Sequence, residues 1–467
     1  MSTRRTKIIC TIGPATASYP KLEGLHAAGM NIVRLNMSHA DHASAKKIIN
    51  WIKTLNRKVQ APVAIMLDTQ GPEIRTGEIN EPMNLGAGEV ITVSVLPDDV
   101  ERSSVHINYR ELVDVLKIGD RITVDNGLIN FEVLEKDGSR LVCRVLDGGL
   151  LGSKRHVNLP GIRVNLPAIT AKDRKDIEFA VEHDVDFIAL SFVRSAADVH
   201  ELREFLGAKV KNIKIIAKIE DQEGVTNVHE IVRAADGVMV ARGDLGIETN
   251  IADLPNVQRR IVHSCAKWGK RSIVATHLLE SMIEHPVPTR AEVTDVANAI
   301  YEGVDGIMLS GETSVGKHPI RCVEQLDEIA RASERWPGLG YEKELVAISD
   351  KQHIAINAVA LAEDINAKGI VVITRRGITA DLVTSARPRS VPIYAFTNHS
   401  QTRRRLGLNR AVFSHRMQFS SDPEKTLQRA LRILREREGM SPNDKVVVIS
   451  DVLAKKNTDA IQVRHLD

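Results

Sequence analysis

Eight short apolar runs recur between residues 7 and 310 of this 467-residue chain, and most are separated by segments of helix length. The runs cover residues 7–13, 32–37, 63–68, 187–192, 214–219, 237–242, 272–276 and 306–310. Each has the length and composition of a buried strand, and the intervening segments carry apolar residues near the helical period. Eight strands alternating with helices are the number that closes a (β/α)8 TIM barrel, so we expect an α/β fold built on one.

Two consecutive runs end in the same arrangement of charges. Lys218 and Glu220 close the run KIIAKIE, and Arg242 and Asp244 follow the run VMVA at the same two-residue spacing. Because side chains alternate faces along a strand, the two members of each pair are expected on one side. An ammonium, a guanidinium and two carboxylates should therefore converge where barrel active sites lie, at the carboxyl ends of the strands. A surface ion-pair cluster is the alternative interpretation.

The other runs also end in polar residues. These residues are Arg34, Asn36, Ser38, Asp68, Thr69, Ser191, Thr276, Ser310 and Glu312. A polar residue at one strand end is common on any protein surface. Polar residues at nearly every strand end indicate a functional site rather than an ordinary solvent-exposed surface.

Two regions depart from the barrel pattern. Between the third and fourth runs, short alternating strands are separated by GAG, DNG, KDG and DGG turns, which predicts a small β-barrel inserted as a lid. After Trp336-Pro337-Gly338, four apolar runs alternate with helices and predict an open-sheet α/β domain. The predicted domains are 1–71 with 168–340 for the barrel, 72–167 for the lid and 341–467 for the C-terminal domain.

Composition excludes several classes of protein. Lys and Arg number 63 against 60 Asp and Glu, and aromatic residues make up 3%, so neither nucleic acid nor a membrane surface is an expected partner. The N-terminal segment carries no long apolar run, which predicts a cytoplasmic protein. The four cysteines lack CxxC spacing and are expected to be buried free thiols.

Several specific segments appear in a fixed order along nearly the whole chain. They are TKIICTIGPAT, GMNIVRLNMSHA, LDTQGPEIRTG, VNLPG, DVDFIALSFVR, IIAKIEDQEG, VMVARGDLGIE, ATHLLESMIEHPVPTRAEVTDVANA and IMLSGETSVGKHP. In this order they resemble the pyruvate kinase family. The resemblance implies a barrel with a lid after its third strand and an α/β C domain. It also implies transfer of a phosphoryl group from phosphoenolpyruvate to ADP, which is the last step of glycolysis.

The resemblance implies roles for individual residues at the strand ends. Glu220 and Asp244 would hold Mg²⁺ or Mn²⁺, for which hard carboxylate oxygens are suited. Arg34 and Lys218 would contact the transferring phosphoryl group, where planar and compact cations stabilise developing charge. Gly243, Asp244 and Thr276 would contact the substrate, with Thr276 belonging to a water relay that protonates the enolate.

Further ligand sites follow from the same resemblance. Asn36, Ser38, Asp68 and Thr69 would hold K⁺, and Glu73 goes with dependence on K⁺. His39, Arg75 and Arg155 match positions that contact the nucleotide. Residues Thr374, Arg375, Arg376, Gly377 and Thr379 form a turn that would grip a sugar-phosphate effector, and an ordinary charged surface turn is the alternative. A homotetramer is expected, with barrel domains paired through residues 288–292.

Four residues depart from the family pattern. They are Gln70, Asn126, Arg155 and His277, and none of them removes a core catalytic group. Two alternative functions remain open at this point: another metal-enolate barrel enzyme, such as a lyase or aldolase acting on pyruvate, and a catalytically idle metabolite sensor.

Overall fold

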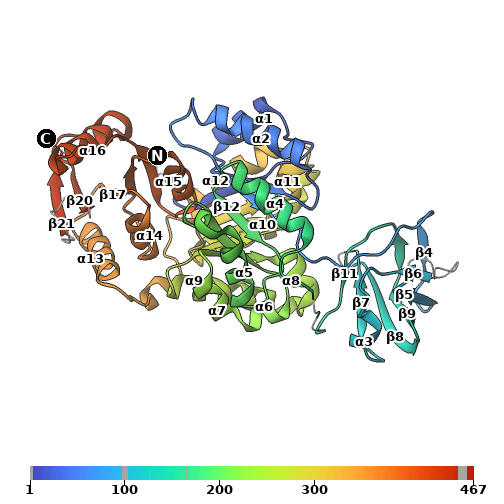
Figure 1. The fold of residues 1–467 in the computed structure, drawn as a ribbon. Helices are drawn as coiled ribbons and strands as arrows, with labels where there is room; N and C mark the ends of the chain where they lie inside the picture. The colour runs from blue at the N-terminus through green and yellow to red at the C-terminus, as the bar shows by residue number, and fades with distance from the viewer. Residues whose placement is uncertain are drawn as a thin grey trace.

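The protein is seen here as a computed structural model that describes residues 4–96, 104–125, 127–162, 164, 166–450 and 460–466. Asn126, one of the departures named above, lies outside the described residues. The barrel lies between two smaller bodies, the inserted sheet on one side and the C-terminal sheet on the other (Figure 1).

Eight parallel strands close a barrel, in the order β1-β16-β15-β14-β13-β12-β3-β2. The strands are β1 (Lys7–Thr11), β2 (Ile32–Asn36), β3 (Ala64–Asp68), β12 (Phe187–Leu190), β13 (Lys214–Ile219), β14 (Gly237–Ala241), β15 (Arg271–Ala275) and β16 (Gly306–Leu309). Each lies within two residues of a predicted run at either end. The predicted TIM barrel is therefore confirmed.

Helices pack around the outside of the barrel. They are α1 (Tyr19–Ala28), α2 (His42–Leu55), α4 (Ala171–Glu182), α5 (Ala196–Leu206), α6 (Gln222–Thr226), α7 (Val228–Ala234), α8 (Arg242–Glu248), α9 (Leu254–Lys267), α10 (Arg290–Tyr301), α11 (Gly311–Ser314) and α12 (Pro319–Ser333). Sequence-encoded caps start several of them: Thr170 and Asp173 form a capping box at α4, and Thr289 and Glu292 form one at α10.

The barrel interior is filled by side chains that point inward from the strands. Ile9, Met66, Phe187 and Met239 are buried there together with Leu408, which comes from the C-terminal part of the chain. The barrel is thus a packed core, and Leu408 closes its amino-terminal end.

The insertion consists of a six-stranded sheet in the order β11-β7-β8-β9-β5-β6 and a two-stranded ribbon of β10 and β4. The elements are β4 (Met83–Leu85), β5 (Val90–Ser94), β6 (Ser104–His106), α3 (Leu112–Val115), β7 (Arg121–Val124), β8 (Ile129–Asp137), β9 (Arg140–Asp147), β10 (Gly149–Leu151) and β11 (Val157–Asn158). The sequence predicts a small barrel here. The two edges of the six-stranded sheet are joined by two isolated bridges, Arg75 to His156 and Thr76 to Ile107, rather than by a continuous strand. Arg75 and Thr76 lie where the chain leaves the barrel, so the entry segment itself links the two edges.

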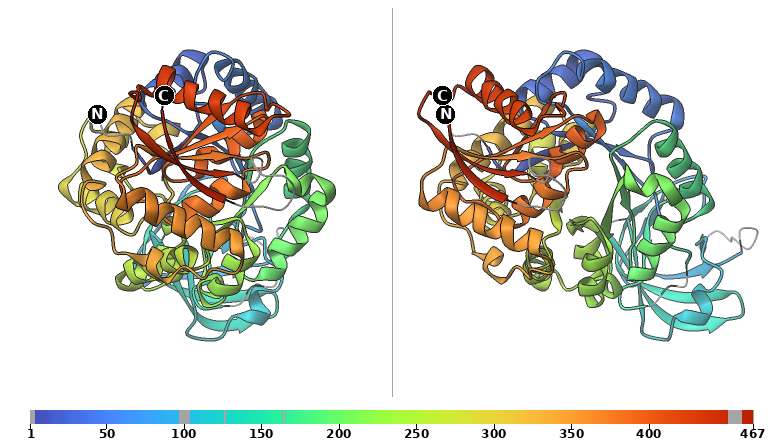
Figure 2. Two further views of the ribbon diagram at one scale, coloured as in Figure 1. Left: turned by 90° about the vertical axis from the view of Figure 1, so that its left-hand side faces the viewer. Right: turned by 60° about the vertical axis from the view of Figure 1, so that its left-hand side comes forward.

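The C-terminal part forms a five-stranded sheet in the order β19-β18-β17-β20-β21, with helices packed against it (Figure 2). Its elements are α13 (Asp350–Asp364), β17 (Gly369–Ile373), α14 (Ile378–Ser385), β18 (Ile393–Thr397), α15 (Ser400–Arg405), β19 (Val412–Arg416), α16 (Pro423–Glu438), β20 (Lys445–Ser450) and β21 (Ala460–His465). Only β21 runs antiparallel to its neighbour. The open α/β sheet is confirmed. The strand β21 was not predicted from the sequence.

Two smaller expectations can be compared with the structure. All four cysteines are buried and free, as predicted. Within the described residues, no helix is both long and apolar enough to cross a membrane.

Candidate functional site

A cavity of about 330 Å³ opens at the carboxyl ends of the barrel strands and faces the inserted sheet. Its walls include nine residues predicted for the site: Arg34, Asn36, Ser38, His39, Arg75, Arg155, Lys218, Glu220 and Asp244. Two strands with the residues that follow them, one helix and the insertion therefore bring these nine residues to one place.

Lys218 is the centre of a buried charge network in this cavity. Its Nζ lies 3.1 Å from Asp68 Oδ1 and 2.9 Å from Glu220 Oε1, and donates to Ser191 Oγ over 2.8 Å. Arg34 Nε lies 2.5 Å from the second oxygen of Asp68. Asp68 is fully buried, so this one carboxylate fixes both cations.

Within this network, Asp68 and Lys218 stabilise each other in their ionised forms. Burial alone would raise the pKa of Asp68, but Arg34 and Lys218 outweigh it and lower that pKa. Burial opposes the charge of Lys218, yet Asp68 and Glu220 raise its pKa above the ordinary value. Lys218 is therefore a fixed cation at neutral pH.

Glu220 and Asp244 present two carboxylates to the same cavity. Burial raises the pKa of Glu220 to about 7, and it also raises the pKa of Asp244. Glu220 Oε2 accepts a hydrogen bond of 2.6 Å from the backbone N–H of Phe192, which fixes its orientation. Two desolvated carboxylates on one wall fit a divalent cation that also takes oxygens from substrate and water.

The described residues contain no cluster of three or more His, Cys, Asp or Glu side chains arranged to hold a metal ion. Glu220 and Asp244 would therefore supply only part of a coordination shell. Mg²⁺ tolerates this because it usually binds proteins through one or two carboxylates.

Arg242 does not join this cluster, so one part of the predicted convergence is wrong. Its Nη1 lies 2.6 Å from Asp295 Oδ1 on α10, and its Nη2 donates to Thr276 O over 2.7 Å. The strand β14 ends at Ala241 and α8 begins at Arg242. Residues two apart on a helix point about 200° apart, so Arg242 and Asp244 face different ways.

Thr276 and Gly243 lie together beside the cavity without lining it. The backbone N–H of Gly243 donates to Thr276 Oγ1 over 2.8 Å, and that hydroxyl donates to Ala275 O over 2.6 Å. Thr276 and His277 have φ values of 67° and 52°. Two consecutive left-handed residues at a strand end are a strained turn of the kind found at active sites.

The four residues predicted to hold K⁺ are partly engaged within the protein. Asn36 Oδ1 accepts from the backbone N–H of Ser38 over 3.1 Å, and Thr69 O accepts from Ser191 Oγ over 2.7 Å. Both carboxylate oxygens of Asp68 face cations. Asn36 and Ser38 line the cavity, whereas Asp68 and Thr69 are buried behind it.

Two of the predicted nucleotide contacts, Arg75 and Arg155, belong to the insertion side of the cavity, whereas His39 follows β2 of the barrel. Arg75 Nη2 lies 2.6 Å from Glu73 Oε2, and Gln70 Nε2 donates to the same oxygen over 3.0 Å. Arg155 Nη1 lies 3.3 Å from Asp125 Oδ1 across the inserted sheet. Gln70, a departure from the family pattern, therefore helps to position Glu73.

Several lining residues were not assigned a role from the sequence, among them Ser191, Lys154 and His156. Ser191 connects Lys218 and Thr69, and Lys154 and His156 line the wall beside Arg155. Ser191 was expected at the site as a polar strand end, but its contact with Lys218 was not predicted. Lys154 and His156 carry no such signal because their placement depends on how the insertion folds back over the barrel.

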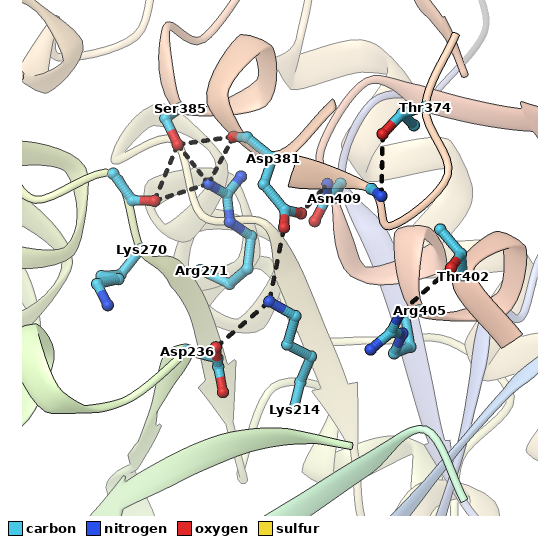
Figure 3. Close-up of polar contacts among 12 residues, drawn as sticks. Lys214, Asp236, Lys270, Arg271, Thr374, Asp381, Ser385, Thr402, Arg405 and Asn409 are labelled. Carbon is cyan, nitrogen blue, oxygen red and sulfur yellow. Dashed lines mark hydrogen bonds and ion pairs between the residues drawn. The ribbon is translucent and has the colours of Figure 1, made fainter. Parts of the chain in front are cut away.

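The predicted effector turn connects β17 to α14 and lies far from the cavity. Thr374 Oγ1 accepts from the backbone N–H of Gly377 over 3.0 Å, and Gly377 has a φ of 89° (Figure 3). Arg375 and Arg376 are exposed, but Thr374 and Thr379 are buried. The two cations thus face solvent, whereas the two hydroxyls do not.

The helix α14 that follows this turn rests on the foot of the barrel (Figure 3). Ser385 Oγ accepts from Arg271 Nη2 over 2.6 Å, and Lys214 Nζ lies 3.6 Å from Asp381 Oδ2. Lys214 begins β13, the strand that carries Lys218 near its other end. The turn and the site are therefore linked through one helix and one strand.

The fold and the cavity define a barrel enzyme whose charged site sits at the strand ends beneath an inserted sheet. The family model for the pyruvate kinase barrel domain matches residues 3–323, and the model for the pyruvate kinase alpha/beta domain matches residues 352–464. The chain belongs to the pyruvate kinase family.

Individual relatives match nearly the whole of this chain. The plastidial pyruvate kinase 2 of Arabidopsis thaliana is 40% identical over 472 residues, covering 99% of this chain and 81% of that protein. A pyruvate kinase of Dictyostelium discoideum is 41% identical over 96% of this chain and 91% of its own length. The crystal structure of a pyruvate kinase from Cryptosporidium parvum superposes with a TM-score of 0.94 at 35% identity, covering 99% of this chain and 96% of that chain.

Proposed function

We propose that this chain transfers the phosphoryl group of phosphoenolpyruvate to ADP, yielding pyruvate and ATP in the last step of glycolysis. The observation that carries the proposal is the placement of Arg34 and Lys218 against Asp68 and Glu220 in one cavity of a chain that belongs to this family. Two fixed cations beside carboxylates suit an anionic substrate and a metal ion together.

In the proposed reaction, a terminal oxygen of ADP attacks the phosphorus atom as the bond between phosphorus and the enol oxygen breaks. The electron pair of that bond stays on the enol oxygen, and the enolate then takes a proton at carbon. Arg34 would bind phosphoryl oxygens through its planar fork, and Lys218 would neutralise the charge that develops between phosphoryl group and enolate.

Glu220 and Asp244 would hold Mg²⁺ or Mn²⁺. When bound, the metal ion would polarise the substrate oxygens and offset their charge. The burial of Glu220 and Asp244 supports this assignment. Burial raises the pKa of both carboxyl groups, and a bound cation would offset the cost of ionising them.

Thr276 would help deliver the proton to the enolate through water. Its hydroxyl already bridges Gly243 N–H and Ala275 O, so it is fixed in orientation, and an alcohol with an ordinary pKa is a poor acid on its own. Gly243 and Asp244 would contact the substrate from the first turn of α8.

K⁺ would be held by oxygens of Asn36, Ser38, Asp68 and Thr69. Asn36 and Ser38 reach the cavity directly. Asp68 and Thr69 would have to share oxygens that now serve Lys218 and Ser191, so K⁺ binding should be coupled to the arrangement of Lys218.

His39, Arg75 and Arg155 would bind ADP as the insertion approaches the barrel. We further propose a homotetramer paired through residues 288–292 and the C-terminal sheets, a cytoplasmic location, and a sugar-phosphate effector at residues 374–379. The domain division at 71/72, 167/168 and 340/341 is proposed with them.

A lactate dehydrogenase-coupled assay with phosphoenolpyruvate, ADP, Mg²⁺ and K⁺ tests the activity. Pyruvate formation that depends on ADP supports the proposal. Pyruvate formation without ADP would indicate hydrolysis rather than phosphoryl transfer. Saturable phosphoenolpyruvate binding without turnover would indicate an idle sensor, and neither binding nor turnover would indicate a lyase or aldolase that acts on another substrate.

A further inference from the structure

A cavity of about 940 Å³ lies between the barrel and the C-terminal sheet. It is lined by Arg5, which precedes β1, and by Gly303, which precedes β16, so it lies at the end of the barrel opposite the candidate active site. The loop after α12 and the segments before β18 and β19 complete its walls. We call it the foot cavity.

The foot cavity is strongly basic. Its cationic lining residues are Arg5, Arg331, Arg335, Lys343, Lys368, Arg387, Arg389 and Arg410, and its acidic ones are Glu302, Glu334 and Glu342. Arg335, Lys343, Lys368 and Arg389 are exposed at the rim, whereas Arg387 and Arg410 are buried in the inner wall.

Arg410 is a buried cation without a carboxylate partner. Only 9% of the residue is exposed, and no carboxylate of the described residues lies within ion-pair distance of its guanidinium. Its Nη1 donates to Pro388 O over 3.4 Å, and its Nε has no hydrogen-bond partner among the described residues. A buried charge in this state is costly unless another group compensates it.

Arg387 is only partly satisfied. It is 8% exposed, and its Nη2 lies 2.8 Å from Asp305 Oδ2, but its Nη1 has no partner in the part of the chain that the structure describes. Arg387 and Arg410 therefore each have a buried guanidinium nitrogen without a hydrogen-bond acceptor among the described residues.

Glu342 at the rim lies 3.6 Å from Arg389, while the acids nearest the inner wall, Asp305 and Glu334, are engaged by other groups as well. Asp305 also faces Arg271 Nη1 at 3.2 Å and accepts from the backbone N–H of Ser272. Glu334 accepts from the backbone N–H groups of Arg5 and Thr6. Burial, together with the charges of Arg5 and Arg387, lowers the pKa of Arg410 to about 10.

We propose that the foot cavity binds the phosphoryl group of a small phosphate-bearing ligand, with Arg387 and Arg410 in the inner wall and Arg335 and Arg389 at the rim. A dianion with three acceptor oxygens matches several guanidinium donors that approach from different sides, which a single carboxylate cannot do. This inference is independent of the proposed catalysis, because the cavity shares no lining residue with the candidate active site.

Such a ligand would join the two bodies of the protein. Arg387 and Arg410 belong to the C-terminal part, whereas Arg5 precedes the first strand of the barrel. Binding would therefore stabilise their junction. Trp336, one of three tryptophans in the chain, lines the cavity and reports binding by fluorescence.

The test uses the full chain without phosphoenolpyruvate or ADP, at ionic strength fixed with chloride. Inorganic phosphate and glycerol 3-phosphate are titrated while tryptophan fluorescence and the thermal midpoint are followed. We expect saturable binding that Arg410→Met weakens at least tenfold and Arg389→Ala weakens several-fold. Tighter binding of the ester would identify an organic phosphate as the ligand, and equal binding would identify inorganic phosphate.

Lys218→Met and Arg376→Ala are matched controls for the active site and the effector turn, and both should bind within twofold of wild type. Loss of binding in either control, or the absence of saturable binding in wild type, overturns the proposal. If Arg410→Met does not fold, the double variant Arg335→Ala with Arg389→Ala decides, because both residues are exposed. Wild-type affinity in that variant also overturns it.

Discussion

The side-chain amide of Asn158 donates a hydrogen bond of 2.8 Å to Glu248 Oε1. Asn158 ends β11 of the inserted sheet, and Glu248 ends α8 beside the catalytic cavity, so this contact ties the insertion to the barrel. Burial raises the pKa of Glu248 to about 7, although the hydrogen bond from Asn158 lowers it.

The first prediction concerns stability and pH. Folded Glu248 holds its proton more tightly than the unfolded chain, so stability falls as pH rises from about 4.5 to about 7. Glu248→Gln removes this loss and should stabilise the protein above pH 7 by about 1 to 3 kcal/mol relative to wild type. Thermal midpoints measured from pH 4.5 to 8 check this. Exposed Glu178→Gln on α4 is the control, and an equal pH dependence in both variants would contradict the argument.

The second prediction concerns turnover. Lys218→Met should lower kcat by about three orders of magnitude or more, because it removes a fixed cation from the transition state. Substrate affinity should change less. Steady-state kinetics and a circular dichroism spectrum check this, with Lys214→Met at the other end of β13 as the matched control. A folded Lys218→Met protein with wild-type turnover would discard the assigned role.

The third prediction concerns the divalent metal. Asp244→Asn and Glu220→Gln each remove one anionic ligand and should raise the Mg²⁺ concentration needed for half-maximal activity by at least tenfold. Mg²⁺ titrations of the initial rate check this. Glu223→Gln, which lies nearby on α6 outside the cavity, should titrate like wild type. If the Mg²⁺ titration curves of Asp244→Asn and Glu220→Gln coincide with that of wild type, the metal assignment is wrong.

The fourth prediction concerns K⁺. Wild-type activity should require K⁺, because the carboxylates of Asp68 and Glu73, although paired with cations, face an anionic substrate and leave too little positive charge to offset it. Glu73→Lys should reduce that requirement by supplying an ammonium. It should also weaken ADP binding, since Glu73 fixes Arg75 at 2.6 Å. Initial rates at constant ionic strength in potassium, sodium and tetramethylammonium chloride check this, and equal wild-type rates in all three would refute it.

The fifth prediction concerns the effector turn. A sugar phosphate should raise the thermal midpoint of wild type but not of Arg376→Ala, because Arg376 is an exposed cation at the start of α14. A thermal-shift panel of sugar phosphates checks this, and Arg432→Ala on α16 controls for lost surface charge. No ligand-dependent shift in wild type would leave an ordinary charged turn as the explanation.

The barrel and most of the site could be predicted because both depend on local sequence. Strand runs are short and periodic, and the carboxyl ends of parallel strands must meet at one face. The convergence of Lys218 and Glu220 could be predicted for this reason. Arg242 was misplaced, because α8 begins at Arg242, where the strand run was expected to continue.

Features that depend on distant parts of the chain left no local signal. Lys7 donates to Val412 O across 405 residues of sequence, and Leu408 fills the floor of a barrel built from other segments. The foot cavity is of this kind, because its inner cations come from loops whose sequences resemble ordinary charged turns.

Asp305 places a limit on how the protein can be divided. Its carboxylate lies just before β16 and serves Arg271 of the barrel as well as Arg387 of the C-terminal part. A chain cut after residue 340 would keep this buried anion but lose one of its cations, and it would also lose Leu408 from the barrel floor. The C-terminal part is therefore not a detachable module, and a shortened barrel made for crystallography or engineering needs a replacement for both residues.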